Sequence, residues 1–225
     1  MKLKNFFNMD YKKIYNQNYF SGKDSFFYKL GYGRFAKFYF NNLFKPLKPH
    51  IQKIGRGKIL DVGCAYGFML RKFPDTFEKF GVDISDYAIM EAHKRLPGAA
   101  LIVGNAEDGL PFPEGFFDIV VCNDVLEHLA DPASALKNIR KVLNNNGILY
   151  INTPNLNWFR RKVFACADKK EHHFSLFSHE TLFDLLTKCG FEILNRWTYT
   201  NLTYFFFLKF KSTLGIESAF ICRKS

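Results

Sequence analysis

The sequence of 225 residues predicts an α/β fold, a mostly parallel sheet with helices on both faces. Three observations lead to this prediction. Short apolar runs typical of buried strands alternate with segments that repeat apolar residues at helical spacing. The first run ends in a glycine-containing turn, as strands of open parallel sheets do. The composition, 48% hydrophobic and 24% charged, is that of a globular protein and excludes disorder throughout the chain.

Seven runs rich in aliphatic and aromatic residues have the composition of buried strands. They are residues 58–62, 80–84, 99–103, 117–122, 148–152, 192–199 and 217–222. Between them, four segments are expected to be helical. They are residues 66–73, residues 86–96, the stretch from Asp131 to the turn at 144–147, and the stretch from Ser178 to Gly190. Asp131 before a proline is typical of a helix start, and Gly190 of a helix stop.

The positive charge of the chain is concentrated near its beginning. Residues 1–58 hold 13 Lys and Arg against two Asp and Glu, whereas residues 59–225 hold 19 of each. The same segment is rich in Phe and Tyr. Two interpretations stay open: its aromatics pack on the rest of the chain, or it binds a nucleic acid, an anionic membrane or an anionic substrate. Prolines at 46 and 49 indicate a boundary, so we expect a basic aromatic arm at 1–57 and a main domain at 58–225.

Several features favour a cytoplasmic protein. No apolar run approaches the roughly 20 residues that span a bilayer, and the first residues lack the apolar stretch of a secretory signal. The five cysteines are scattered and never form a C-x-x-C pair. Such spacing is typical of free thiols in a reducing compartment.

The turn after the first expected strand carries the most informative residues, Asp61, Gly63 and Gly67. Ligands of open parallel sheets bind at the carboxyl ends of the strands, where this turn lies. Ala65 breaks the dinucleotide fingerprint G-x-G-x-x-G, and no phosphate-binding Gly-Lys-Ser/Thr follows. An acid just before the first glycine suits a cation better than a pyrophosphate. Asp83 ends the second strand, from where a carboxylate reaches ribose hydroxyls. A cationic nucleoside without phosphates describes S-adenosylmethionine (SAM); the alternative is that these residues only shape turns and caps.

Ordered motifs between residues 58 and 222 resemble those of class I SAM-dependent methyltransferases. They are LDVGCAYG, GVDIS, GNAEDGLPFPEGFFDIVVCNDVLEHL, NNNGILYINTPN and HHFSLFSHETLFDLLTKCGFEI. The branch that they resemble contains ubiquinone-pathway O-methyltransferases and small-RNA 2′-O-methyltransferases. The resemblance implies a Rossmann-like, seven-stranded, mostly parallel sheet whose last strand is antiparallel.

The resemblance also implies a set of cofactor-binding residues. They are Asp61, Gly63, Cys64, Ala65, Gly67, Asp83, Ile84, Asn105, Ala106 and Asn123. Asn123 is expected to contact the methionine end of SAM through its backbone. Ala65 stands where the family often has glycine, and alanine should be tolerated there if the φ of Ala65 is negative. Asn105 stands where the family often has Asp, and it lacks that charge.

Catalysis requires a nucleophile held in line with the methyl group and a group that removes a proton where the acceptor carries one. The candidates are Glu127 and His128, after the fourth strand, and His173. Each of them could instead have a structural role. Together with Asp124 they also resemble a metal-binding set of that branch, so a divalent metal is a second cofactor to consider.

We therefore expect a SAM-dependent enzyme that O-methylates a small molecule, a sugar or a lipid-linked acceptor. Two alternatives stay open: 2′-O-methylation of RNA, with the arm along the phosphates, and a non-catalytic protein that binds SAM. The acceptor pocket should be formed by the arm and by residues 155–177. The sequence indicates neither the acceptor nor the oligomeric state.

Overall fold

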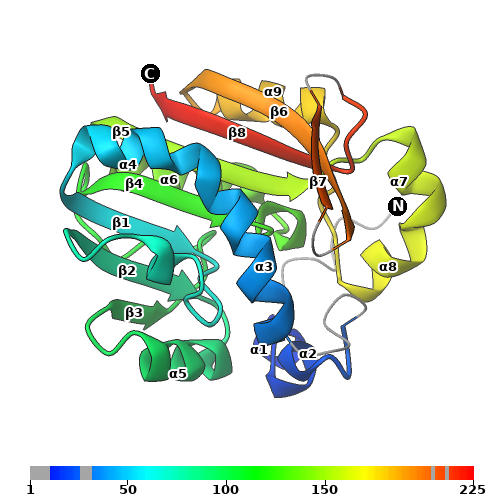
Figure 1. Cartoon of the computed structure of the whole chain (residues 1–225), viewed down its shortest axis with the longest axis horizontal. Coiled ribbons are helices and arrows are strands. Elements are labelled where there is room, and N and C mark those ends of the chain that lie inside the picture. The colour runs from blue at the N-terminus through cyan, green and yellow to red at the C-terminus, as the bar shows by residue number, and fades with distance from the viewer. Residues whose placement is uncertain (1–10, 26–31, 204–205, 211–212) are drawn as a thin grey trace.

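The computed structural model describes residues 11–25, 32–203, 206–210 and 213–225. Its centre is one sheet with the strand order β3-β2-β1-β4-β5-β8-β6-β7 (Figure 1). The strands are β1 (Gly57–Val62), β2 (Phe77–Asp83), β3 (Ala100–Val103), β4 (Phe117–Asn123), β5 (Leu143–Pro154), β6 (Phe191–Thr203), β7 (Phe206–Phe210) and β8 (Glu217–Lys224). Strands β1 to β5 run parallel, and β8 is antiparallel to both of its neighbours. The predicted seven-stranded sheet with an antiparallel last strand is confirmed. The additional edge strand β7, a hairpin partner of β6, was not predicted.

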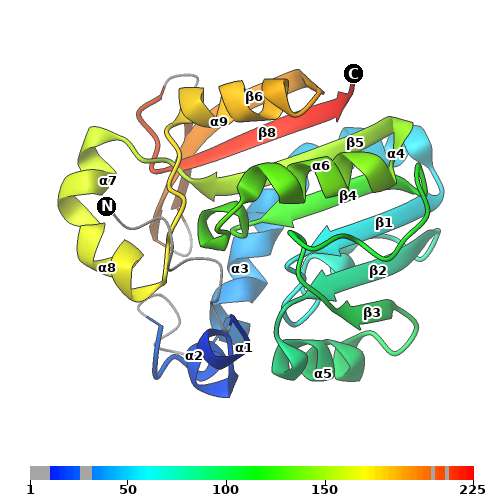
Figure 2. The same cartoon turned by 180° about the vertical axis from the view of Figure 1, so that it is seen from behind.

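Helices cover both faces of the sheet, as predicted. They are α1 (Tyr11–Ile14), α2 (Gln17–Ser21), α3 (Tyr32–Phe44), α4 (Lys48–Ile54), α5 (Asp86–Arg95), α6 (Pro132–Val142), α7 (Trp158–Val163), α8 (Ala165–Lys170) and α9 (His179–Lys188), with the short 3-10 turns η1 (Lys45–Leu47), η2 (Leu70–Lys72) and η3 (Leu126–His128). Helices α3 and α4 lie on one face, and α6 and α9 on the other (Figures 1 and 2). The expected helix start at Asp131 is present, because its side chain accepts the amide of Ser134. The expected stop at Gly190 is also confirmed, since α9 ends at Lys188 and Gly190 has a φ of +80°. At its other end α9 begins after Ser178, which forms a capping box with Thr181.

The helix predicted for residues 66–73 is wrong. Only the 3-10 turn η2 (Leu70–Lys72) forms there. Gly67 has a φ of +73°, and a residue in the left-handed region cannot belong to a right-handed helix. Pro74 disfavours helical backbone at residue 73, so too few residues remain between the two for an α-helix.

The first helices pack on the rest of the chain through their aromatic side chains. Tyr15, Tyr19, Phe20, Tyr32 and Phe40 are buried and belong to the hydrophobic core on one side of the sheet. Helices α1 and α2 and the lower part of α3 lie beyond the carboxyl ends of β1 and β4 (Figure 1). The packing interpretation therefore holds for these five aromatics. None of the helices in the described part of the chain combines the length and apolar character needed to cross a bilayer.

Candidate functional site

A cavity that is partly open to solvent lies at the carboxyl ends of β1, β2 and β4. Nine of the thirteen predicted site residues line it. They are Asp61, Gly63, Ala65, Asp83, Ile84, Asn105, Ala106, Asn123 and His128. The strand ends thus bring together most of the predicted cofactor site.

The other four predicted site residues are not part of the cavity wall. Cys64 is buried and packs against Gly81 of β2. Gly67 allows a close approach to Leu96 at the end of α5. These two residues shape the turn, whereas Glu127 and His173 lie together behind the cavity wall.

The turn after β1 is held in place by the carboxylate of Asp83. Its Oδ2 accepts the backbone N–H of Ala65 at 2.8 Å, and its Oδ1 accepts that of Ser85 at 2.9 Å. The condition set for tolerating alanine at position 65, a negative φ, is not met, since the φ of Ala65 is +44°. Left-handed backbone costs a non-glycine residue about 1–2 kcal/mol, and the hydrogen bond to Asp83 helps to offset this.

The cavity wall is acidic. Burial raises the pKa of Asp61 well above its ordinary value, and the neighbouring Asp83 adds to this effect. Burial also raises the pKa of Asp83 to about 6, although hydrogen bonds from Ser85 and Ala65 oppose the rise. Asp124 lines the cavity as a third carboxyl group, and among the described lining residues there is no Lys or Arg. This charge pattern fits a cationic ligand such as a sulfonium nucleoside and is unfavourable for a phosphate.

Asn123 has a feature that the sequence analysis missed. Its side chain is 8% exposed, lines the cavity, and neither atom of its carboxamide has a hydrogen-bond partner within the described protein. Buried amides are almost always paired, so this side chain fits a ligand that offers both a donor and an acceptor. The amino-acid end of SAM carries both groups.

Four tyrosines of the first helices complete the opposite wall of the cavity, and the sequence analysis did not identify them. Each one makes a hydrogen bond to a titratable side chain of the main domain. The pairs are Tyr11 with Glu107 (3.2 Å), Tyr15 with His128 Nδ1 (2.8 Å), Tyr19 with Glu171 (2.9 Å) and Tyr39 with Asp124 (2.7 Å). The four-residue spacing of Tyr11, Tyr15 and Tyr19 was the only signal in the sequence, since it places three phenols on one face of a helical segment.

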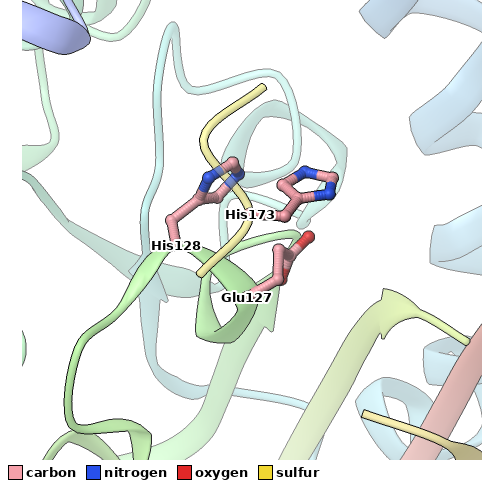
Figure 3. A group of neighbouring side chains, drawn as sticks. All are labelled: Glu127, His128 and His173. Carbon is pink, nitrogen blue, oxygen red and sulfur yellow. The ribbon is translucent and has the colours of Figure 1, made fainter. Parts of the chain in front are cut away.

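Glu127, His128 and His173 form a cluster in which one ligand atom of each lies within 4.8 Å of the others. Figure 3 shows the two imidazole rings side by side, with the Glu127 carboxylate directed toward them. Glu127 is 1% exposed; its Oε2 accepts the hydroxyl of Thr153 at 2.8 Å, but its Oε1 has no partner within the described residues. His173 Nδ1 hydrogen bonds to Asp168 at 2.9 Å, as the outer carboxylates of metal-bound histidines commonly do.

These three side chains fit a divalent cation. Burial, with a contribution from His173, lowers the pKa of His128 to about 3, so its imidazole is neutral as a metal ligand must be. The prediction that Asp124 belongs to this metal-binding set is wrong, because its carboxylate is directed to other partners. Its two carboxylate oxygens accept hydrogen bonds from Tyr39 and Asn152.

Comparison with known sequences places the chain in a family. A family model described as a methyltransferase domain matches residues 35–195. An uncharacterized protein of Methanocaldococcus jannaschii is 31% identical over 152 residues, which is 66% of this chain and 69% of that protein. A ubiquinone biosynthesis O-methyltransferase of Thiobacillus denitrificans is 31% identical over 105 residues, covering 44% of this chain and 45% of that enzyme. A tRNA U34 carboxymethyltransferase of Campylobacter jejuni is 29% identical over 117 residues, covering 49% and 40%. The matches therefore span less than half of either named enzyme.

Solved structures share the fold. A SAM-dependent methyltransferase of Thermotoga maritima, described as a possible histamine N-methyltransferase, superposes with a TM-score of 0.68 at 21% identity, covering 85% of this chain and 91% of that one. A protein of Pyrococcus horikoshii gives a TM-score of 0.65 at 20% identity and covers 97% and 100%. The fold, the acidic cavity at the strand ends and the family match agree: the chain belongs to the class I SAM-dependent methyltransferases.

Proposed function

We propose that the chain transfers the methyl group of SAM to a hydroxyl oxygen of a small acceptor. The part of the acceptor that enters the cavity carries no phosphate. The observation that carries this proposal is the composition of the cavity wall. It has three carboxyl groups, the neutral imidazole of His128 and a row of phenols, and no cationic side chain among its described residues. Such a wall favours an uncharged or cationic acceptor, for example a phenol, a sugar or the polar part of a lipid.

The cofactor occupies the side of the cavity that the main domain forms. Asp83 would accept the ribose hydroxyls, and the Asn123 carboxamide would pair with the amino-acid end. The buried carboxyl group of Asp61 lies next to Asp83 on the same wall. Asn105 and Ala106 follow β3, where the adenine would lie. With the cofactor on this side, the tyrosines of the first helices would form the opposite wall, which leaves the space between them for the acceptor.

The acceptor then lies between the methyl group and the first helices. As its oxygen forms the bond to the methyl carbon, the bond between that carbon and sulfur breaks, and S-adenosylhomocysteine leaves with the sulfur electron pair. The hydroxyl proton has to leave as well. His128 lines the cavity, is neutral, and has its Nδ1 anchored by Tyr15, so it is the group placed to accept this proton.

The RNA alternative has a relative in its favour, the tRNA-modifying enzyme of Campylobacter jejuni. The cavity wall is unfavourable for an RNA acceptor. The phosphates of RNA would lie close to the methyl group and would face three carboxyl groups. Labelled SAM incubated with neutral alcohols and phenols, with amines and with RNA distinguishes the classes. An O-methyl ether identified by mass spectrometry supports the proposal, whereas product only with amines or RNA refutes it.

The role of His128 is tested separately. His128→Ala should lower kcat at least tenfold while the SAM dissociation constant changes little, since the side chain acts on the acceptor proton. His93→Ala, on the exposed side of α5, is the matched control and should leave both quantities unchanged. Equal losses of kcat and of SAM affinity in His128→Ala would indicate a structural role.

A second candidate is metal-assisted transfer. It is favoured by Glu127, which lies beside two imidazoles and whose Oε1 has no hydrogen-bond partner among the described residues. A divalent ion held by Glu127, His128 and His173 would lower the pKa of the acceptor hydroxyl. Calorimetric titration of chelator-treated protein with Zn²⁺, Mn²⁺ and Mg²⁺ tests this independently of activity. Binding that is lost in Glu127→Gln but kept in Glu192→Gln, an exposed control, supports the metal site. Absence of binding would leave His128 as the proton acceptor on its own.

A further inference from the structure

The three most exposed large apolar side chains of the described protein, and a fourth exposed one, lie on or beside α7. Seven large hydrophobic side chains are exposed in the described residues, and four of these lie on or beside this helix. They are Trp158 (69% exposed), Phe159 (47%), Val163 (56%) and Leu214 (71%). Leu214 is beside the helix because its carbonyl accepts the side-chain amide of Asn157, the N-cap of α7. Contiguous exposed apolar groups of this kind mark interaction sites more often than isolated ones do.

The helix is fixed so that these side chains point to solvent. Arg160 is 1% exposed and lies on the opposite side of α7. Its guanidinium forms ion pairs with Asp168 at 2.6 Å and with Glu217 of β8 at 3.2 Å. At helical spacing Trp158 then falls on the outer face, and Phe159 and Val163 fall on one flank of the helix, between Trp158 and Arg160. The buried ion-pair anchor thus fixes α7 in an orientation in which all three apolar side chains are exposed.

Exposed basic side chains lie on α7 itself and on the helix that follows it, α8. Arg161, Lys162, Lys169 and Lys170 of α7 and α8 are exposed. The only acid between residues 158 and 170 is Asp168, which is buried in its ion pair. Lys162 Nζ lies 4.5 Å from the ring centroid of Trp158, so charge and aromatic group are interleaved. We name these four basic and four apolar residues the α7–α8 surface.

We propose that the α7–α8 surface binds the anionic surface of a lipid bilayer. Its apolar side chains enter the interface between headgroups and acyl chains, and its basic side chains contact the acidic headgroups. The aliphatic side chains favour a lipid over a nucleic acid, because Val163 and Leu214 have no π-face to stack on a base, whereas an acyl region removes them from water. This interaction goes beyond the proposed function and does not depend on it. It also differs from the membrane contact considered for the N-terminal arm, five of whose aromatics are buried.

The two tryptophans of the chain provide a direct readout. Trp197 is 2% exposed and Trp158 is 69% exposed, so a change in emission on binding reports on the α7–α8 surface. The full chain is mixed with vesicles of phosphatidylcholine alone and with vesicles that also contain phosphatidylglycerol. With the anionic vesicles we expect co-sedimentation and a blue shift of the emission, both weakened by added salt. With the neutral vesicles we expect much weaker binding.

Two variants locate the contact. A basic residue at an anionic surface contributes about fivefold to binding, so Lys169→Glu with Lys170→Glu should weaken it by at least about 30-fold. The matched control is Lys48→Glu with Lys53→Glu on α4, an equal change of charge at exposed positions, which should weaken binding far less. Trp158→Ala should abolish the blue shift, whereas Leu194→Ala, at a separate exposed position, should not.

Three outcomes would overturn the proposal. The first is no binding to anionic vesicles. The second is an equal loss of binding in the α4 control, which would assign the interaction to net charge. The third is a response of the Trp158 emission to single-stranded RNA but not to vesicles, which would assign the surface to a nucleic acid. Circular dichroism of each variant confirms that the fold is retained.

Discussion

Gly63 connects the cofactor turn to the loop that carries the candidate proton acceptor, and substituting it tests this connection. Gly63 has a φ of +73°, and a Cβ atom built on it would overlap Cγ2 of Val125. Val125 lies just before η3, which contains His128. Gly63→Ala therefore strains the turn and pushes against this loop at the same time.

The expected cost follows from these two effects. Left-handed backbone costs a non-glycine residue about 1–2 kcal/mol, and an extra methyl group in a packed position typically costs about 1–3 kcal/mol. Gly63→Ala should thus lower the free energy of unfolding by about 2–5 kcal/mol, measured by urea denaturation. In the double variant Gly63→Ala/Val125→Ala the overlap is removed. Its loss of unfolding free energy should therefore be smaller than the sum of the losses in the two single variants.

Two further measurements make the test decisive. Gly98→Ala is the control, because no atom lies within 4 Å of its added Cβ, and its stability should change by less than about 0.5 kcal/mol. SAM affinity, measured by calorimetry, should fall in Gly63→Ala and recover partly in the double variant. A Gly63→Ala protein with wild-type stability and SAM affinity, or a double variant without any coupling, would refute the reasoning.

Three other predictions concern the cofactor, the first helices and a cap. Burial raises the pKa of Asp83 to about 6, so the carboxylate proposed to accept the ribose hydroxyls is present above this pH and is lost below it. SAM affinity should therefore fall as the pH drops through 6, and Asp83→Asn should bind weakly without this dependence. Glu171→Ala leaves the hydroxyls of Tyr19 and Ser25 without their carboxylate, so trypsin should cleave the first helices faster; an unchanged rate would contradict the contact. Asp131→Ala removes the N-cap of α6 and should cost about 1 kcal/mol in urea denaturation, and no measurable loss would show that the cap is dispensable.

The cofactor side of the cavity could be predicted because its signals are local. Asp61 and Gly63 follow one strand directly, Asp83 ends the next, and parallel strands align these ends at one edge of the sheet. The hydrophobic run of each strand therefore fixed where its last residues would lie. The backbone conformation of Ala65 could not be predicted in this way, since it depends on a hydrogen bond to Asp83 that forms only when the two strands pair.

The acceptor side could not be predicted because its contacts join distant parts of the chain. Tyr15 and His128 are 113 residues apart, and Tyr39 and Asp124 are 85 residues apart. No periodicity indicates such pairs, which arise from how the first helices pack across the strand ends. The sequence pattern showed only that the aromatics of this segment were numerous enough to pack.

This division of the cavity determines where the acceptor specificity has to be sought. The family match begins at residue 35, so Tyr11, Tyr15 and Tyr19 lie outside it, whereas Asp61 and Asp83 lie within it. In the proposed arrangement the matched Asp61 and Asp83 belong to the wall that would hold the common cofactor, and the unmatched tyrosines belong to the wall that would face the acceptor. The match to the family model over residues 35–195 therefore supports SAM as the methyl donor and carries little information on the acceptor. Substitutions of these tyrosines should alter acceptor KM more than SAM affinity, because they change only the second wall.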